Sequence, residues 1–252
     1  MKLTHGHLLG GRIRYAQPQT GYRTGIEPVL LAAFVPARPG ERVLEAGTGA
    51  GAGLLCLSAR VPTLAGVGLE ISPAMANLAR QNLAANGVDG FEIRTGDVAG
   101  GVPGPFDHAF ANPPWHDRRS TPSPRAGRRA AKQQTGTALE TWVASLAGSL
   151  RPGGTLTLIL PAGQTGRAGA AMQASGLGAL AVTNLLPKLG RPAKLALIAG
   201  RLGAEGAGRT ADVVLHREDG AYTDWAEAIL RGTDPAEAPS PAAALTQARD
   251  CA

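Results

Sequence analysis

A glycine-rich stretch at residues 47–53 constrains the fold more than any other feature of the chain. It follows a short apolar segment that contains Val43 and Leu44, and an apolar run at residues 54–57 comes directly after it. Its glycines are Gly47, Gly49, Gly51 and Gly53. Glycine allows positive φ angles and the close approach of a ligand, so a strand, a glycine turn and a helix N-terminus together form a nucleotide pocket. The pattern therefore predicts an α/β fold with a nucleotide site after its first central strand.

The glycine stretch alone does not identify the nucleotide. The spacing Gly47-x-Gly49-x-x-Ala52 also satisfies the dinucleotide-binding pattern. NAD and S-adenosylmethionine (SAM) both remain open at this point. A turn that needs glycine only for its backbone shape is the third alternative.

A second stretch favours SAM. Residues 106–111 have the apolar pattern of a buried strand, and they end in Asn112-Pro113-Pro114-Trp115. Prolines lack the N–H that a central strand needs, so this tetrapeptide stands at the strand's carboxyl end, where open α/β sheets bind ligands. Asn-Pro-Pro followed by an aromatic residue is typical of methyltransferases that act on amino groups.

Two acidic residues follow further predicted strands. Residues 63–69 form an apolar segment that ends in Glu70, which is 23 residues (70 − 47) beyond Gly47. A carboxylate there can accept hydrogen bonds from both ribose hydroxyls, or it can serve only as a charge at the start of the next helix. Asp97 follows a predicted strand at residues 91–95, where it can reach an adenine amino group or simply form a turn. The predicted cofactor-binding residues are Glu45, Gly47, Thr48, Gly49, Gly51, Glu70, Ile71, Asp97, Val98 and Asn112.

The N-terminal segment, residues 1–40, is expected to cover the cofactor pocket and the substrate. A helical pattern begins at Thr24, which we expect to be the N-cap, with Glu27 completing a capping box. Residues 12–15 suggest a short strand. His5 and His7 lack neighbouring cysteines or carboxylates, so we expect them to be exposed to solvent and predict no metal site.

The bulk properties fit one domain at residues 1–232, followed by a disordered Pro- and Ala-rich tail at residues 233–252. The formal net charge of +6 permits a polyanionic partner without requiring one. Cys56 and Cys251 are not expected to form a disulfide. Without a membrane span or a signal peptide in the pattern, we expect a cytoplasmic protein that does not enter the membrane and is a monomer or a weak homodimer.

A long polar segment at residues 116–137 contains many basic side chains. Its basic residues are Arg118, Arg119, Arg125, Arg128, Arg129 and Lys132. A loop of this length in a compact domain is usually functional or disordered. A second basic segment, with Lys188, Arg191 and Lys194, is predicted to be a turn between two strands.

Taken together, these stretches resemble the SAM-dependent methyltransferases that act on adenine N6 in bacterial tRNA, in particular the tRNA1(Val) adenine-37 group. Besides the glycine loop and Asn-Pro-Pro-Trp, the resemblance is carried by Leu9-Gly10-Gly11-Arg12, Gln17-Pro18, Gly21-Tyr22-Arg23, Leu30-Leu31-Ala32-Ala33, Gly190-Arg191-Pro192-Ala193-Lys194 and Gly220-Ala221-Tyr222-Thr223. It covers residues 8–232. Trp115 stands where this family mostly has tyrosine, and Glu45 where aspartate is common.

The resemblance implies a Rossmann-like class I fold, with a mostly parallel sheet of seven strands covered by helices on both faces. It implies methyl transfer from SAM to an adenine N6 amino group in tRNA, at position 37 of the anticodon loop. The implied catalytic residues are Asn112, Pro113, Pro114 and Trp115, and those for substrate binding are Arg23, Arg118, Arg128, Arg129, Lys188, Arg191 and Lys194. Two alternatives stay open: a glutamine N5-methyltransferase of the release-factor type, and a SAM-binding protein without activity.

Overall fold

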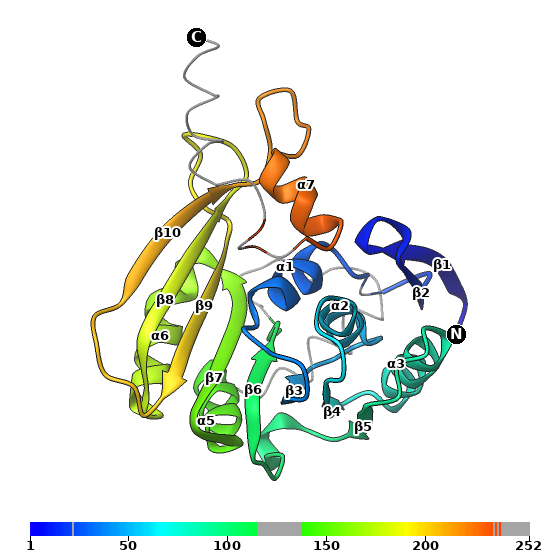
Figure 1. The fold of residues 1–252 in the computed structure, drawn as a ribbon, viewed down its shortest axis with the longest axis horizontal. Helices are drawn as coiled ribbons and strands as arrows, with labels where there is room; N and C mark the ends of the chain where they lie inside the picture. Colours follow the sequence, from blue (N-terminus) through cyan, green and yellow to red (C-terminus); the bar gives the residue numbers. More distant parts are fainter. Residues whose placement is uncertain (22, 115–137, 234, 236, 238–252) are drawn as a thin grey trace.

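The computed structural model describes residues 1–21, 23–114, 138–233, 235 and 237. A central sheet of eight strands crosses the molecule in the order β10-β8-β9-β7-β6-β3-β4-β5 (Figure 1). β9 runs antiparallel to its neighbours β7 and β8, and the other strand pairs are parallel. The strands are β3 (Arg42–Ala46), β4 (Ala65–Glu70), β5 (Phe91–Thr95), β6 (Phe106–Ala111), β7 (Leu150–Pro161), β8 (Leu177–Leu186), β9 (Leu195–Leu202) and β10 (Arg209–Val214).

The mostly parallel sheet agrees with the predicted fold, but it has eight strands and not seven. The additional strand is β10, which pairs only with β8 at the edge of the sheet. Its first four residues are exposed and only its last two are buried. An edge strand of this kind has little of the apolar alternation by which strands are recognised in a sequence.

Helices cover both faces of the sheet (Figure 1). On one face lie α1 (Glu27–Phe34), α2 (Ala52–Arg60), α3 (Pro73–Ala85) and α7 (Asp224–Leu230), and on the other lie α5 (Leu139–Gly148) and α6 (Thr165–Ala174). The strands alternate between two apolar clusters. Phe110 belongs to the first cluster, whereas its neighbours Ala109 and Ala111 belong to the second. This alternation places the functional side chains at the ends of the strands, because the faces are filled by packing.

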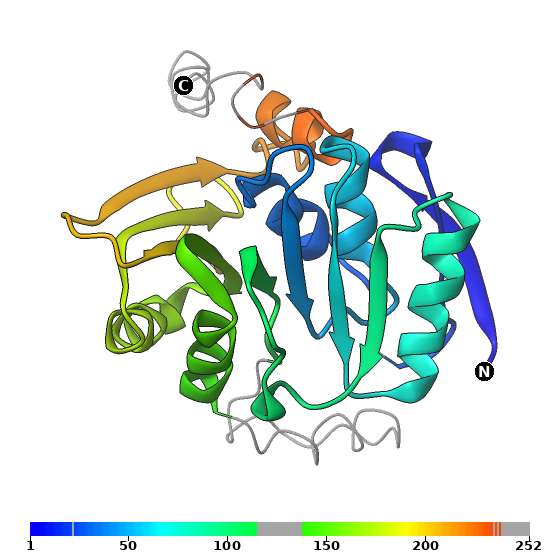
Figure 2. The same cartoon turned by 60° about the horizontal axis from the view of Figure 1, so that its bottom comes forward.

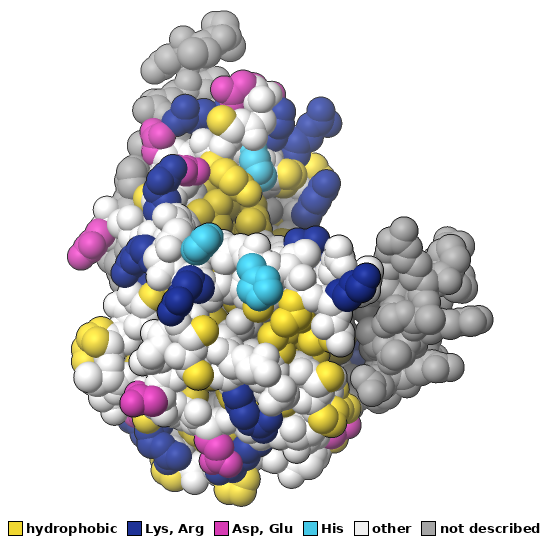
Figure 3. All heavy atoms as spheres, turned by 90° about the vertical axis from the view of Figure 1, so that its right-hand side faces the viewer, with side chains coloured by type: hydrophobic (Ala, Val, Ile, Leu, Met, Phe, Trp, Pro, Cys, Tyr) yellow, Lys and Arg dark blue, Asp and Glu magenta, His cyan; other side chains and the backbone are white. Residues whose placement is uncertain are grey.

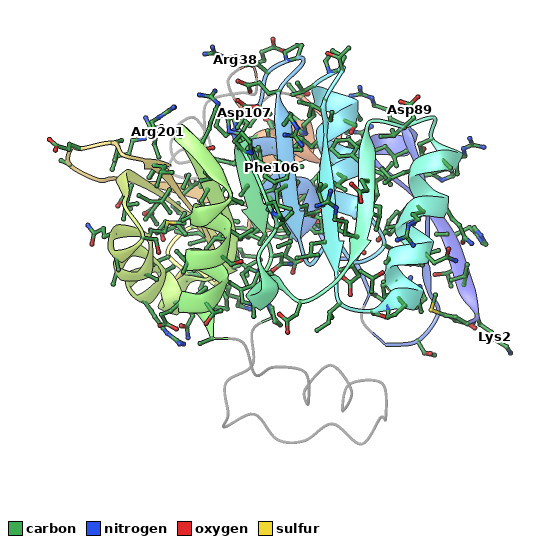
Figure 4. All side chains as sticks on the ribbon, turned by 90° about the horizontal axis from the view of Figure 1, so that it is seen from below. Lys2, Arg38, Asp89, Phe106, Asp107 and Arg201 are labelled. Carbon is green, nitrogen blue, oxygen red and sulfur yellow. The ribbon has the colours of Figure 1, made fainter. Side chains whose placement is uncertain are left out.

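The two edges of the sheet differ. The carboxyl ends of β3, β4 and β5 point to the same edge (Figure 2). Arg38, Asp89, Asp107 and Arg201 lie along the opposite, amino edge, and Lys2 lies toward the carboxyl edge (Figure 4). The glycine loop, Glu70 and Asn112 follow β3, β4 and β6, so these predicted site residues lie at the carboxyl edge.

A separate two-stranded hairpin precedes the sheet. β1 (Leu3–Leu8), a 3-10 turn η1 (Leu9–Gly11) and β2 (Ile13–Pro18) form it, so the strand suggested at residues 12–15 is confirmed and longer than expected. Ile13 and Tyr15 are buried beneath the hairpin. His5 and His7 are exposed on β1, and Figure 3 looks onto this face, where histidine, Lys and Arg side chains are prominent.

The predicted capping box at Thr24 was wrong. α1 begins at Glu27, and its N-cap position is Ile26, which makes no side-chain cap hydrogen bond. Thr24 is used elsewhere: its hydroxyl is 2.8 Å from the Tyr15 hydroxyl, and its N–H donates to Gln17 Oε1 at 3.0 Å. Thr24 therefore ties the segment before α1 to the hairpin. None of the described helices is long and apolar enough to span a membrane.

Candidate cofactor and active site

The glycine loop between β3 and α2 needs glycine for two different reasons. Gly47, Gly49 and Gly51 have φ angles of 68°, 56° and 86°, in the left-handed region that other residues avoid. Gly53 is required by space, because a Cβ there would lie 2.0 Å from Glu45 Oε1. The N–H groups of Gly47 and Thr48 donate to the carbonyl of Leu69, at 2.8 and 3.1 Å, and hold the loop against the end of β4.

Glu45 supports the loop from below. It is 5% exposed, and its Oε2 accepts hydrogen bonds from Thr48 Oγ1 at 2.5 Å and from the N–H of Leu54 at 3.2 Å. Burial raises the pKa of Glu45 to about 8, although both hydrogen bonds act to lower it. Folding therefore favours the protonated form of this carboxyl group. The observed partners of Glu45, which are Thr48 and Leu54, belong to the loop and to α2. Contact of Glu45 or Thr48 with the cofactor stays a prediction.

Glu70 lies at the carboxyl end of β4, against the loop. Its Oε2 accepts a hydrogen bond from the N–H of Gly49 at 2.9 Å, and its Oε1 accepts one from the N–H of Ser72 at 2.8 Å. Each carboxylate oxygen can accept a further bond, so two ribose hydroxyls remain compatible with these contacts. Ile71, which follows Glu70, is 41% exposed. Its contact with the cofactor stays a prediction.

Asp97 follows β5 and caps the short 3-10 turn η2 (Val98–Gly100). Its Oδ1 accepts a hydrogen bond from the N–H of Ala99 at 2.9 Å, and its side chain is exposed, whereas Val98 is buried. The turn-forming role of Asp97 is therefore observed. Its contact with adenine, and that of Val98, stay predictions.

Asn112, Pro113 and Pro114 leave the sheet beside the glycine loop. Ala111, the last residue of β6, is the register partner of Ala46, the last residue of β3. Adjacent strands are about 4.8 Å apart, so the Asn-Pro-Pro segment and the loop start as direct neighbours. Asn112 is half-buried, Pro113 is buried and Pro114 is exposed. Trp115 lies outside the described residues.

The predicted substrate-binding residues fall into three groups. Arg23 is exposed in the segment between β2 and α1. Arg118, Arg128 and Arg129 lie outside the described residues, as does the rest of the basic segment at residues 115–137. The third group, Lys188, Arg191 and Lys194, occupies the turn between β8 and β9.

The turn at residues 187–194, here called the basic turn, reaches the same edge as Asn112. β7 is parallel to β6, and β9 is antiparallel to both β7 and β8, so β8 runs in the direction of β6. The turn follows the carboxyl end of β8 and therefore lies at the carboxyl edge. Arg191 and Lys194 are exposed, whereas Lys188 Nζ donates to the carbonyl of Glu218 at 2.6 Å. β8 is three strand positions from β6. At about 4.8 Å per strand, the basic turn is displaced from Asn112 by about 14 Å across the sheet. The register places Ala111 level with Val182, so the turn also begins several residues further along the strand direction.

Sequence reasoning missed Asn82. This residue of α3 is 3% exposed, and its carboxamide contacts both the hairpin and the glycine loop. The signal that could have found it is a pair of asparagines, Asn82 and Asn86, four residues apart in a helical pattern where asparagine is unfavourable. Among the described residues, no group of three or more His, Cys, Asp or Glu side chains is arranged to hold a metal ion.

Solved structures with a similar fold are methyltransferases. A predicted O-methyltransferase from Agrobacterium tumefaciens aligns with a TM-score of 0.65 over 82% of this chain and 96% of its own, at 24% identity. A methyltransferase from Pyrococcus furiosus aligns with a TM-score of 0.55 over 76% of this chain and 90% of its own, at 20% identity. The fold is that of the class I SAM-dependent methyltransferases.

The chain belongs to the methyltransferase small domain family, whose model matches residues 27–168. SAM is therefore the expected cofactor. A tRNA1(Val) (adenine(37)-N6)-methyltransferase from Bacteroides thetaiotaomicron is 30% identical over 73% of this chain and 78% of its own length. A release factor glutamine methyltransferase from Cereibacter sphaeroides is 32% identical over 69% of this chain. The chain spans 65% of the length of that second relative.

Proposed function

We propose that the chain transfers a methyl group from SAM to the exocyclic N6 amino group of an adenine in tRNA, at position 37 of the anticodon loop. The observation that supports this most is the position of Asn112 and Pro113. They follow β6, next to the glycine loop that follows β3, so an amino group held by them lies beside the cofactor's end of the site. An unpaired base in an RNA loop reaches such a pocket at little cost.

The chemistry follows from the acceptor's electronic structure. The lone pair of an adenine amino group is delocalised into the ring, which makes the nitrogen a poor nucleophile. The Asn112 side-chain oxygen and the Pro113 carbonyl can accept hydrogen bonds from the two N–H groups of the amino group. These bonds favour the pyramidal nitrogen that attacks the methyl group. They also stabilise the positive charge that develops on nitrogen. Pro113 and Pro114 restrict the backbone and so keep the carbonyl in place.

An RNA acceptor is supported by the charge and by the relatives. The chain carries a formal net charge of +6, and the exposed Arg191 and Lys194 are on the same edge as Asn112. The similarity to the tRNA-modifying relative extends over most of both chains. Phosphate contacts by such side chains would position the RNA without reading its sequence.

Glutamine in a release factor is the second candidate acceptor. It is favoured by the release factor relative, whose identity to this chain is similar at 32%. A glutamine side-chain amide also has a delocalised lone pair and two hydrogens, so the same pair of acceptors can serve it.

One assay separates the alternatives. Purified protein is supplied with SAM carrying a labelled methyl group, together with tRNA and a release factor at equal concentration. We expect the label in N6-methyladenosine after nuclease digestion of the tRNA, and no label with Asn112→Ala. Label in a glutamine of the release factor would contradict the tRNA proposal and support the second candidate acceptor. SAM binding without transfer to either would indicate a binding protein.

A further inference from the structure

Asn82 in α3 and Asn86 at its C-cap dock the N-terminal hairpin onto the domain. Asn82 Oδ1 accepts a hydrogen bond from the N–H of Ala16 at 3.0 Å, and its Nδ2 donates to the carbonyl of Ala16 at 2.8 Å. Asn86 makes the same pair of bonds with Arg14, at 2.9 and 2.7 Å. Arg14 and Ala16 are two residues apart, so their polar backbone groups point to the same side of β2. The two carboxamides therefore bind β2 much as a neighbouring strand would.

The third hydrogen bond of each asparagine is different. Asn82 Nδ2 also donates to the carbonyl of Ala50 in the glycine loop, at 2.9 Å. Asn86 Nδ2 donates instead to the carbonyl of Asn82, within its own helix, at 2.8 Å. Of the two, Asn82 alone links the hairpin to the loop. At 3% exposed, it has no water to replace these bonds if they are lost.

The bond to Ala50 fixes a part of the loop that would otherwise be adaptable. Ala50 lies between two glycines in the left-handed region, and glycine backbones have many accessible conformations. The carbonyl of Ala50 and the N–H of Gly51 belong to one planar peptide. The same N–H donates to the carbonyl of Thr48 at 2.8 Å. Asn82 thus sets the orientation of the peptide from which α2 begins.

α3 supports the loop at a second point, next to this bond. A Cβ on Gly51 would lie 3.4 Å from the Cβ of Ala79, which is one turn before Asn82 in α3. On the far side of the loop, the N–H of Gly49 is held by Glu70. The loop therefore lies between the carboxyl end of β4 and a helix that also carries the hairpin.

We infer that Asn82 is a positioning residue that couples docking of the β1–β2 hairpin to the shape of the cofactor loop. A loop that is already ordered loses less conformational freedom when the cofactor binds, so affinity should depend on the bond to Ala50. Coupling of this kind is reciprocal, so the cofactor should in turn stabilise the docked hairpin. The inference concerns the SAM site alone and holds for either acceptor.

Asn86 provides a matched control for the affinity experiment. S-adenosylhomocysteine is titrated calorimetrically into the parent, Asn82→Ala and Asn86→Ala proteins. We expect Asn82→Ala to weaken binding about tenfold, the scale of one hydrogen bond. Asn86→Ala should change affinity by less than about twofold, because Asn82 still holds the hairpin at Ala16 and keeps its bond to Ala50. Thermal unfolding of both variants measures the loss of stability that each suffers from its missing hydrogen bonds to the hairpin.

Equal losses of affinity in the two variants, or no loss in either, would overturn the inference. A second measurement on the parent protein decides the matter even if Asn82→Ala does not fold. Amide hydrogen exchange at Ala16 should slow by more with saturating S-adenosylhomocysteine than exchange at Val182 in β8, across the sheet from the loop. Exchange at Ala16 that does not respond to the ligand would contradict the coupling.

Discussion

At the scale of single residues, Asn112 is among the predicted cofactor-binding residues, but its main proposed role is to hold the acceptor amino group. It follows the last residue of β6, beside the start of the loop. We predict that Asn112→Ala lowers kcat by about 10²- to 10³-fold, the usual effect of removing one preorganised dipole from a transition state. Affinity for S-adenosylhomocysteine, measured by calorimetry, should stay close to that of the parent. A parallel loss of binding and turnover would show that the pocket had collapsed.

Glu70 needs a sharper test, because it also holds the N–H groups of Gly49 and Ser72. Glu70→Ala should weaken binding of S-adenosylhomocysteine by about 1.5–3 kcal/mol, the scale of hydrogen bonds to a charged group. Loss of loop support alone would have a similar effect. The ribose role is isolated by repeating both titrations with the 2′-deoxy form of the ligand.

If Glu70 binds the ribose, removal of the 2′-hydroxyl should weaken binding by the parent protein but hardly affect binding by Glu70→Ala. The two losses are then not additive, as expected for groups in contact. Additive losses of free energy in this cycle would leave Glu70 as a support of the loop only.

Glu45 makes a prediction about pH. Burial raises its folded pKa from an ordinary 4.5 to about 8, so folding favours the protonated form. The resulting stability is complete below the unfolded pKa and is lost as the pH rises through the folded pKa. Glu45→Gln should remove about 1–3 kcal/mol of the fall in unfolding free energy between acidic and alkaline pH. Denaturant titrations across that range test this, and parallel profiles for parent and variant would contradict it.

At the scale of elements, strands buried on both faces were the easiest to predict. The segment at residues 106–111 matches β6, because a largely apolar run between breakers identifies a central strand. The segment at residues 91–95 matches the edge strand β5, in which apolar and polar residues alternate. β1 and the first four residues of β10 were harder, since half of β1 and all four of those β10 residues are exposed. In the same way, the Thr24 capping box fitted the local pattern, but Tyr15 and Gln17 bind Thr24 from another element. Contacts of this kind with another element cannot be recognised from the local sequence pattern.

The site shows the same division. The positions of the glycine loop, Glu70 and the Asn-Pro-Pro segment follow from strand ends, which a sequence pattern can locate. Asn82 could not be found in this way, because its role depends on β2 and the loop meeting at one helix. The protonated state of Glu45 also depends on packing, since burial dominates its pKa.

The basic turn gives a prediction for a whole element. If Arg191 and Lys194 contact RNA phosphates, their joint replacement by alanine removes two contacts. The slope of log affinity against log salt concentration should then become shallower by about 1.4, or about 0.7 per contact with single-stranded RNA. Binding isotherms at several salt concentrations measure this slope. The turnover rate at saturating tRNA should change little.

The control variant carries the same loss of charge at the other edge. Arg201, near the end of β9, lies on the amino edge (Figure 4). Arg209 is the first residue of β10, which is parallel to β8, so it begins at the same edge. Joint replacement of these two by alanine should leave the slope unchanged. Equal slopes for both double variants would contradict RNA contacts at the basic turn. Arg128 and Arg129 would then be the next residues to replace.

At the scale of the whole molecule, the cofactor part of the site is supported by different observations from the acceptor part. The fold, the family and SAM as the expected cofactor agree with one another. The cofactor loop lies between β4, α2 and α3, in the part of the chain that the family model matches. The acceptor depends on what approaches the carboxyl edge from outside, where relatives with similar identity carry names for different substrates.

The central claim, methylation of adenine N6 in tRNA, is tested most directly by mass spectrometry of tRNA nucleosides. Total tRNA from a strain that lacks this gene is compared with tRNA from the parent strain and from the deletion strain complemented with the Asn112→Ala gene. We predict that N6-methyladenosine falls in the deletion strain, returns with the parent gene and does not return with the variant. An unchanged N6-methyladenosine content in the deletion strain would contradict the claim.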